Sequence, residues 1–143
     1  MKTLLEKLRT FASKLDSITL LGIRLVLAYG FYKPATMKWN DINAIGGWFE
    51  SMGYPFPYLN AYLAGVTEVA GVILLVLGLG TRLISVPLIF VMLVAIFTVH
   101  ISNGFEAGNN GFEIPLYYIV MFVVLIVYGG GKYSVDRIIS KRK

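Results

Sequence analysis

Four long apolar stretches limit the possible folds of this chain more than any other feature. They cover residues 18–37, 58–80, 83–101 and 114–130. A helix needs about 17 to 25 such residues to cross the hydrocarbon core of a bilayer, and each stretch meets that length. The chain is 57% hydrophobic with a mean hydropathy of +0.71, and soluble domains contain only about 45 to 50% apolar residues. We therefore predict an all-α integral membrane protein, a bundle of four transmembrane helices.

The positive charges give the predicted bundle a direction. The formal net charge is +5, and most Lys and Arg residues lie at the two termini, with Arg82 in the short GLGTR turn between the second and third stretches. The loop at 38–57 contains only Lys38, and residues 102–113 contain no positive residue. Because loops rich in Lys and Arg stay in the cytoplasm, we predict that both termini are cytoplasmic. Charge placed in this way indicates membrane topology, and we expect no nucleic-acid partner.

Two further segments have the pattern of amphipathic helices. Residues 1–16 place their Leu and Phe side chains on one face, which predicts a basic helix on the cytoplasmic surface. Residues 42–52 carry apolar side chains at helical spacing before the GYPFP breaker, which predicts an interfacial helix in the first outer loop. The predicted units are the helix 1–16, a four-helix domain over 17–137 and a basic cytoplasmic tail over 138–143.

Ionisable residues inside the apolar stretches are the candidates for function, because such groups are costly in lipid unless they are paired or hydrated. Arg24 lies in the first stretch and Glu68 near the middle of the second, and we predict that the two side chains pair. His100 and Lys38 lie at the outer boundary, and Glu113 begins the fourth stretch. We predict a polar core that opens outward. A structural alternative stays open, in which the Arg–Glu pair only sets helix register and the histidine is an interfacial residue.

Helical spacing places these residues on three faces. On the first stretch the face is Arg24, Ala28, Phe31, Ala35 and Lys38. Around Glu68 it is Ala61, Ala64, Gly65 and Gly71. On the fourth stretch it is Glu113, Tyr117, Met121, Val124 and Tyr128. Small residues let helices approach closely, so we expect the three faces to meet around the polar core.

The cysteine and histidine counts exclude several classes of chemistry within this chain. It has no cysteine and one histidine. Disulfides, thiolate metal clusters and multi-histidine metal sites are therefore excluded, and we predict no metal site and no covalent cofactor.

The charged motifs together resemble one known family. They are Arg24 and Lys38, the segment EVAGVILLVLGLGTR from Glu68 to Arg82, the stretch from Met92 to His100, the segment Gly111-Phe112-Glu113, and GGGKYSVD ending at Asp136. Over roughly residues 18–137 the chain is similar to the DoxX family of small bacterial membrane proteins. Family members usually have Gly and Pro where this chain has Ala35 and Gly130.

The resemblance implies a four-helix bundle in the bacterial inner membrane and, for some relatives, a place in membrane oxidoreductase systems. One related subunit works in thiosulfate oxidation coupled to quinone reduction, and others accompany thiol-redox or oxidative-stress enzymes. Relatives that use cysteine pairs are no guide here, because this chain has no cysteine.

Three functions are therefore open. The first is a subunit or accessory of a quinone-linked redox system, with a redox enzyme or another membrane subunit as partner. In that function the catalytic candidates are Glu68 as proton relay and Arg24 and His100 as hydrogen-bond donors, and the ligand contacts are Lys38, Glu113 and Tyr117. The second is non-redox binding or transport of a small anion or a metal-bearing metabolite. The third is a membrane scaffold for a partner enzyme, and the small-residue faces would also suit a homo-oligomer.

Overall fold

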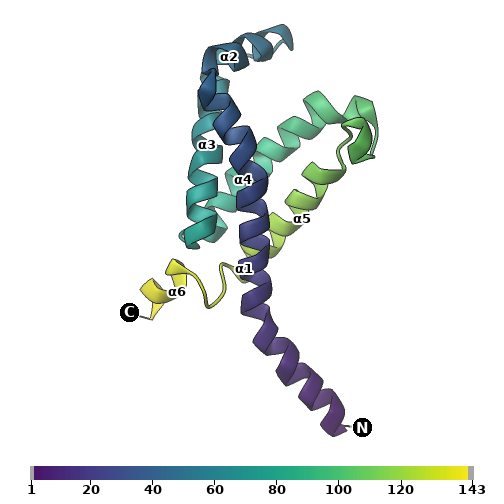
Figure 1. The fold of residues 1–143 in the computed structure, drawn as a ribbon, viewed down its shortest axis with the longest axis vertical. Coiled ribbons are helices and arrows are strands. Elements are labelled where there is room, and N and C mark those ends of the chain that lie inside the picture. The colour runs from purple at the N-terminus through teal and green to yellow at the C-terminus, as the bar shows by residue number, and fades with distance from the viewer. Residues whose placement is uncertain (1, 142–143) are drawn as a thin grey trace.

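The structure, a computed structural model, describes residues 2–141, and these residues form helices joined by short loops (Figure 1). The α-helices are α1 (Lys2–Asn40), α2 (Ile42–Ser51), α3 (Pro57–Leu77), α4 (Thr81–Ala95), α5 (Glu113–Tyr128) and α6 (Val135–Ser140). Between α4 and α5 lie the π-helical turn η1 (Ile96–His100) and the short 3₁₀ turns η2 (Ile101–Asn103) and η3 (Ala107–Asn109). The described residues contain no strand, so the all-α class is confirmed.

Two described segments are long and apolar enough to cross a membrane. They are α3 and the continuous helical segment Thr81–Asn103 that begins with α4. The apolar helix α5 has only 16 residues, and the apolar half of α1 contains Arg24, Lys33 and Lys38. Length and composition thus support two of the four predicted spans, and the four-helix membrane bundle stays a prediction.

The long helices form two pairs that diverge from one end. α1 packs along α3 and α4 packs along α5. The pairs are joined at the short turn between α3 and α4 and separate toward α2 and the loop after η1 (Figure 1). We call the end with this turn the closed end and the opposite end the open end. The buried core lies between the pairs, and its largest apolar members are Leu27, Phe31, Leu75, Leu88, Phe122 and Leu125.

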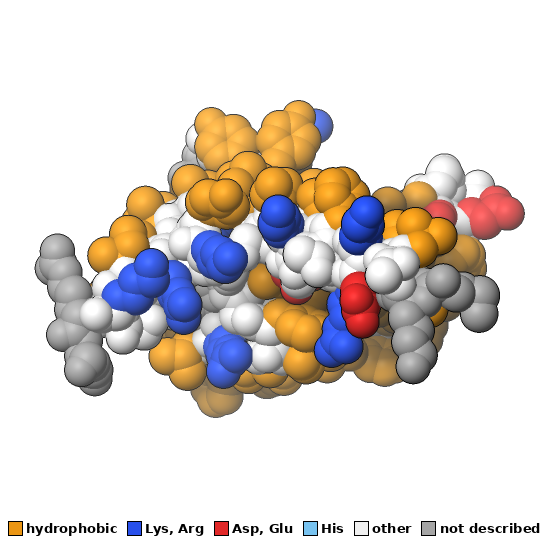
Figure 2. Space-filling view, turned by 90° about the horizontal axis from the view of Figure 1, so that it is seen from below, with side chains coloured by type: hydrophobic (Ala, Val, Ile, Leu, Met, Phe, Trp, Pro, Cys, Tyr) orange, Lys and Arg blue, Asp and Glu red, His pale blue; other side chains and the backbone are white. Residues whose placement is uncertain are grey.

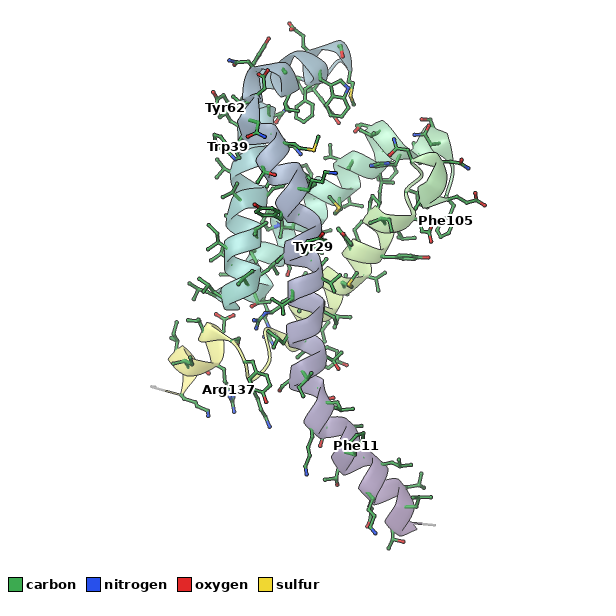
Figure 3. All side chains as sticks on the ribbon, viewed as in Figure 1. Phe11, Tyr29, Trp39, Tyr62, Phe105 and Arg137 are labelled. Atoms are coloured by element: carbon green, nitrogen blue, oxygen red, sulfur yellow. The ribbon has the colours of Figure 1, made fainter. Side chains whose placement is uncertain are left out.

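The predicted cytoplasmic helix and the predicted first span form one continuous helix. α1 has 39 residues, which corresponds to about 58 Å, and it has no break at residue 16. Its first turns project beyond the closed end, where the labelled Phe11 lies (Figure 3). Apolar side chains are exposed along this projecting part, including Leu4, Leu8 and Phe11.

Two predicted local features are confirmed. The segment predicted as a helix at 42–52 is the helix α2, which starts where the Asp41 carboxylate accepts a hydrogen bond from the Ala44 amide at 2.9 Å, and its position at the membrane interface stays a prediction. The GLGTR segment is a tight hairpin in which Gly78 and Gly80 adopt left-handed conformations, with φ of 68° and 58°. A side chain at Gly78 would collide with the Arg24 guanidinium, so the close approach also requires glycine at this position.

Arg24 joins the closed end through hydrogen bonds to backbone carbonyls. Its Nε donates to the carbonyl of Leu75 at 2.9 Å, and its Nη2 donates to that of Val76 at 3.2 Å. Its Nη1 donates to the carbonyls of Gly130 at 2.8 Å and Tyr133 at 2.9 Å. The last carbonyls of a helix have no partner within the helix, and the guanidinium supplies those of α3 with donors while its charge complements the helix dipole.

The predicted pairing of Arg24 with Glu68 is therefore wrong. The side chain of Arg24 extends toward the C-terminal end of α3, whereas Glu68 lies more than a helical turn further into that helix. Four carbonyl acceptors converge at this point, and they match the fork of donors on a guanidinium. The sequence does not identify these four backbone carbonyls as the partners of Arg24, because every residue has a backbone carbonyl.

Asp136 stabilises the neighbouring helix end in the complementary way. Its carboxylate accepts hydrogen bonds from the amides of Gly80 at 2.7 Å and Thr81 at 3.0 Å, at the start of α4. Its own amide donates to the Gly78 carbonyl at 3.0 Å. We call Arg24, Asp136 and the backbone groups that they bind the polar clasp, which ties α1, the α3–α4 turn and the segment before α6 together.

We expect Arg24→Lys to destabilise the fold by about 3 kcal/mol or more. A single ammonium cannot reach four carbonyls in different directions, and each buried carbonyl left without a donor costs about 1 to 3 kcal/mol. Reversible unfolding of the detergent-purified protein measures this loss. The exposed Arg137→Lys is the matched control, and equal stability of the two variants would contradict the clasp.

Candidate functional site

A cavity of about 890 Å³ lies between the two helix pairs toward the open end. Its walls are mainly apolar, and α2 contributes Trp48 and Phe49 to its outer part. Ligand sites of small molecules are commonly about 300 to 1,000 Å³, with apolar walls and a few polar groups. This cavity therefore has the size and the lining of a binding site.

The main charged feature of the cavity is an ion pair between α1 and α3. The Lys38 ammonium Nζ lies 3.0 Å from Oε2 of Glu68 and donates a hydrogen bond to Oε1 at 3.1 Å. Glu68 is only 2% exposed, and both residues line the cavity. Oε2 receives no hydrogen bond from any described residue, because the lysine contact lacks hydrogen-bond geometry. This oxygen is buried, and its partner among the described residues is the Lys38 ammonium in the ion pair.

The predicted faces of α1 and α3 position this pair. All the side chains on the predicted face of α1 from Arg24 to Ala35 are buried, and Lys38 continues the same face toward the open end. On α3 the small residues Ala61, Gly65 and Gly71 are buried beside Glu68. The indole of Trp39 packs on Gly65 and meets the ring of Tyr62 at 6.0 Å, as the labelled residues in Figure 3 indicate. Both predicted faces are confirmed as buried.

His100 reaches the cavity from the π-helical turn η1. Its Nδ1 lies 2.8 Å from the carbonyl oxygen of Asn110, in the loop before α5. The Asn103 side-chain amide donates to the same oxygen at 3.2 Å. π-helical turns are rare and often occur at functional sites, and here the turn ends at the histidine itself.

The predicted polar face of α5 does not reach the cavity. Tyr117 and Tyr128 are exposed, and neither Glu113 nor Tyr117 belongs to the cavity wall. Glu113 instead accepts hydrogen bonds from the Ala107 amide at 2.9 Å and the Tyr117 hydroxyl at 3.0 Å. These contacts order the loop before α5, in which Phe105 lies away from the α1–α3 pair (Figure 3). The expectation that this face meets the polar core is wrong, although ligand contacts of Glu113 and Tyr117 stay predictions.

A different face of α5 is buried. It contains Pro115, Tyr118, Phe122 and Leu125, of which the first two line the cavity. The Tyr118 ring lies 5.9 Å from that of Phe31, and its hydroxyl contacts Gly30. Because α5 is apolar on all sides, hydrophobic periodicity does not distinguish its faces, and it does not indicate that Tyr118 and not Tyr117 lines the cavity.

Several wall residues were not singled out from the sequence. Asn60 and Thr67 lie seven residues apart on α3 and share a face with Ala64, a spacing that could have identified them beside Glu68. The hydroxyl of Tyr54 donates to that of Thr98 and links the segment after α2 to η1. No sequence pattern indicates that contact, because it depends on how the two helix pairs diverge.

The cavity does not continue through the closed end. Arg24 is not part of its wall, and the buried core and the polar clasp lie between the cavity and the closed end. The predicted catalytic role of Arg24 stays untested, and this geometry does not support contact with a ligand. Within residues 2–141 no group of three or more Asp, Glu or His side chains is arranged to hold a metal ion.

We expect Lys38→Met to destabilise the protein by about 3 to 5 kcal/mol, because it leaves the buried Glu68 carboxylate without its ionic partner. The double variant Lys38→Met/Glu68→Leu should recover much of that loss. Chemical unfolding of both variants in detergent checks this, with the exposed Lys33→Met as control. Additive losses in the double variant would show that the two charges do not depend on each other.

Comparison with known proteins agrees with this architecture. The sequence profile of the DoxX family matches residues 19–101. An uncharacterized protein of Haemophilus influenzae is 33% identical over 134 residues, which cover 88% of this chain and 86% of that protein. An uncharacterized membrane protein of Mycobacterium tuberculosis is 30% identical over 131 residues, which cover 84% and 80%. No solved structure matches the chain significantly. With its family profile and its relatives in agreement, the chain belongs to the DoxX family and is a membrane protein.

Proposed function

We propose that this chain is a four-span subunit or accessory of a quinone-linked redox system in the bacterial inner membrane. The observation that carries the proposal is the apolar cavity with a buried Lys38–Glu68 pair, which does not continue through the closed end of the molecule. The proposal treats this cavity as the binding site of a lipophilic carrier with a polar ring.

The charges support four spans with cytoplasmic termini. The apolar part of α1 over 18–37 is about 30 Å long, and the donors of Arg24 are engaged by carbonyls, which lowers the cost of its charge in a membrane. α5 is about 24 Å long, so we expect the bilayer to thin beside it. Figure 2 shows Lys and Arg side chains gathered at the closed end, as expected for the cytoplasmic side. The basic residues in the segments at this end include Lys7, Arg9, Lys14, Lys132 and Arg137.

The position of the cavity favours a ligand that comes from the lipid. Its wall includes Leu63 of α3 and Phe90 of α4, and both side chains are more than half exposed on the outside of the molecule. We therefore propose that a ligand enters from the side, between α3 and α4, as well as from the open end. A quinone partitions into the bilayer and can enter by that route without crossing a charged surface.

The polar groups of the cavity suit a quinone ring. Ring oxygens accept hydrogen bonds, and the Lys38 ammonium has donors beyond the one bound to Glu68. Glu68 lines the cavity beside Lys38 and supplies a carboxylate that can exchange a proton next to such a ring. The position of Glu68 supports its predicted role as a proton relay. Lys38 takes the role of hydrogen-bond donor that was expected of Arg24.

Transport is less favoured than a one-sided site. A transported solute needs a path to both faces, and the polar clasp and the buried core block the path to the closed end. The scaffold alternative is supported by the projecting first turns of α1, whose apolar side chains have no contact partner shown in the described structure (Figure 1). A scaffold role is compatible with the cavity, since a subunit can both bind a carrier and hold a partner enzyme.

We expect the purified chain to bind a short-tailed quinone in its reduced form, and Glu68→Gln and His100→Ala each to weaken that binding by about tenfold. Quinone difference spectroscopy measures the binding, and a quinone reductase assay with the native membrane partner measures the turnover. Tyr29→Phe, on the exposed side of α1 (Figure 3), is the control. No quinone binding, or full binding in both site variants, would reject the proposal.

The topology can be tested directly because the chain has no cysteine. A single cysteine at Asn109 in η3 should react with a membrane-impermeant maleimide in intact spheroplasts. A cysteine at Ser140 in α6 should react only after the membrane is disrupted. The cysteine-free parent gives the background, and labelling of both sites in intact spheroplasts would exclude the proposed orientation.

A further inference from the structure

The hydrogen bond of His100 determines which ring nitrogen carries the proton. Its Nδ1 lies 2.8 Å from the carbonyl oxygen of Asn110, and a carbonyl oxygen can only accept. Nδ1 must therefore be the N–H donor. In the neutral imidazole Nε2 then has no hydrogen and presents a lone pair.

The surroundings of His100 leave Nε2 for a ligand. His100 and Asn110 both line the cavity, and the amide of Asn103 holds the same carbonyl at 3.2 Å. No described residue makes a hydrogen bond to Nε2. The ring is thus oriented by its Nδ1 contact, and its second nitrogen is an acceptor that no described residue engages, on a residue that lines the cavity.

We infer that the cavity selects ligands with a hydroxyl group, which donates its hydrogen bond to Nε2 of His100. This inference rests on the proposed function and deepens it, because it names the form of the carrier that binds best. A hydroquinone or another phenol has the required donor. A quinone carbonyl has none, and its lone pairs would face the lone pair of Nε2.

The two polar parts of the cavity then have opposite roles. Lys38 donates to an oxygen of the ligand, whereas His100 accepts from a hydroxyl. This is the opposite of the donor role that the sequence suggested for His100. A site with one donor and one acceptor distinguishes the reduced from the oxidised form of the same ring, since only the reduced form can satisfy both groups.

The test separates hydrogen bonding from redox chemistry by using ligands that do not exchange electrons. The full chain in lipid nanodiscs is titrated with a 4-alkylphenol and with the 4-alkylanisole of the same tail. Quenching of tryptophan fluorescence reports binding, because Trp48 lies in the cavity wall. We expect the phenol to bind about tenfold more tightly than the anisole, the value of one hydrogen bond with an otherwise unpaired acceptor.

Two substitutions of His100 test the roles of its two ring nitrogens separately. In His100→Asn the amide nitrogen can replace Nδ1 and keep the bond to the Asn110 carbonyl, but the acceptor at Nε2 is lost, so the preference for phenol should disappear. In His100→Gln the side-chain oxygen reaches the Nε2 position, so a preference should remain. Asn109→Ala, whose side chain binds Glu106 and does not belong to the cavity wall, is the control and should keep the preference.

The results of these titrations test the role of His100 separately from the proposed function of the cavity. Equal affinity for phenol and anisole in the unsubstituted chain, or an unchanged preference in His100→Asn, overturns the inference and leaves the cavity as a site for lipophilic ligands. No binding of either compound overturns the proposed function as well. Because the comparison in the unsubstituted chain needs no variant, poor folding of one substitution does not prevent a decision.

Discussion

A guanidinium surrounded by carbonyl oxygens holds one end of this molecule together. Arg24 is 1% exposed and donates to four backbone carbonyls from α3 and from the segment before α6. An unpaired charge at this depth would be strongly destabilising, so the carbonyls and the arginine each require the other. Asp136 completes the arrangement by accepting from the first amides of α4. Three segments distant in sequence are thereby joined at one place.

The open end is a consequence of this closure. Because the two helix pairs are joined at the closed end and diverge from it, the space between them widens with distance from the polar clasp (Figure 1). Near the clasp that space is filled by large apolar side chains such as Leu88 and Phe122. Further along, the small side chains on α3 and the absence of helix crossings leave the cavity, and Lys38 reaches into it to neutralise Glu68. The binding site is thus the region that the core does not fill.

The buried face of a helix could be predicted from the sequence where a charged residue marks that face. It could not be predicted reliably where no charged residue does so. Arg24, Glu68 and Lys38 each belong to a face of small or apolar residues, and these faces are buried as predicted. The partner of Arg24 was wrong, because backbone carbonyls compete with carboxylates for a guanidinium and leave no trace in the sequence. The face of α5 was also wrong: Tyr117 and Tyr118 are equivalent by composition, and only the packing against Phe31 distinguishes them.

Arg24 and Lys38 have different roles in this molecule: the arginine stabilises the fold, and the lysine belongs to the candidate site. A guanidinium has five donors in a rigid plane, which suits it to several carbonyls that converge at a helix end. An ammonium is a compact charge on a flexible chain, and at Lys38 it can remain bound to Glu68 while a further donor turns toward a ligand. Exchanging the two residue types would disrupt both places for different reasons. Of the five ionisable residues of the predicted polar core, Glu113 lies outside the cavity wall and the other four form two systems. Arg24, with Asp136, determines where the bundle closes, and Lys38, Glu68 and His100 determine what the open end can hold.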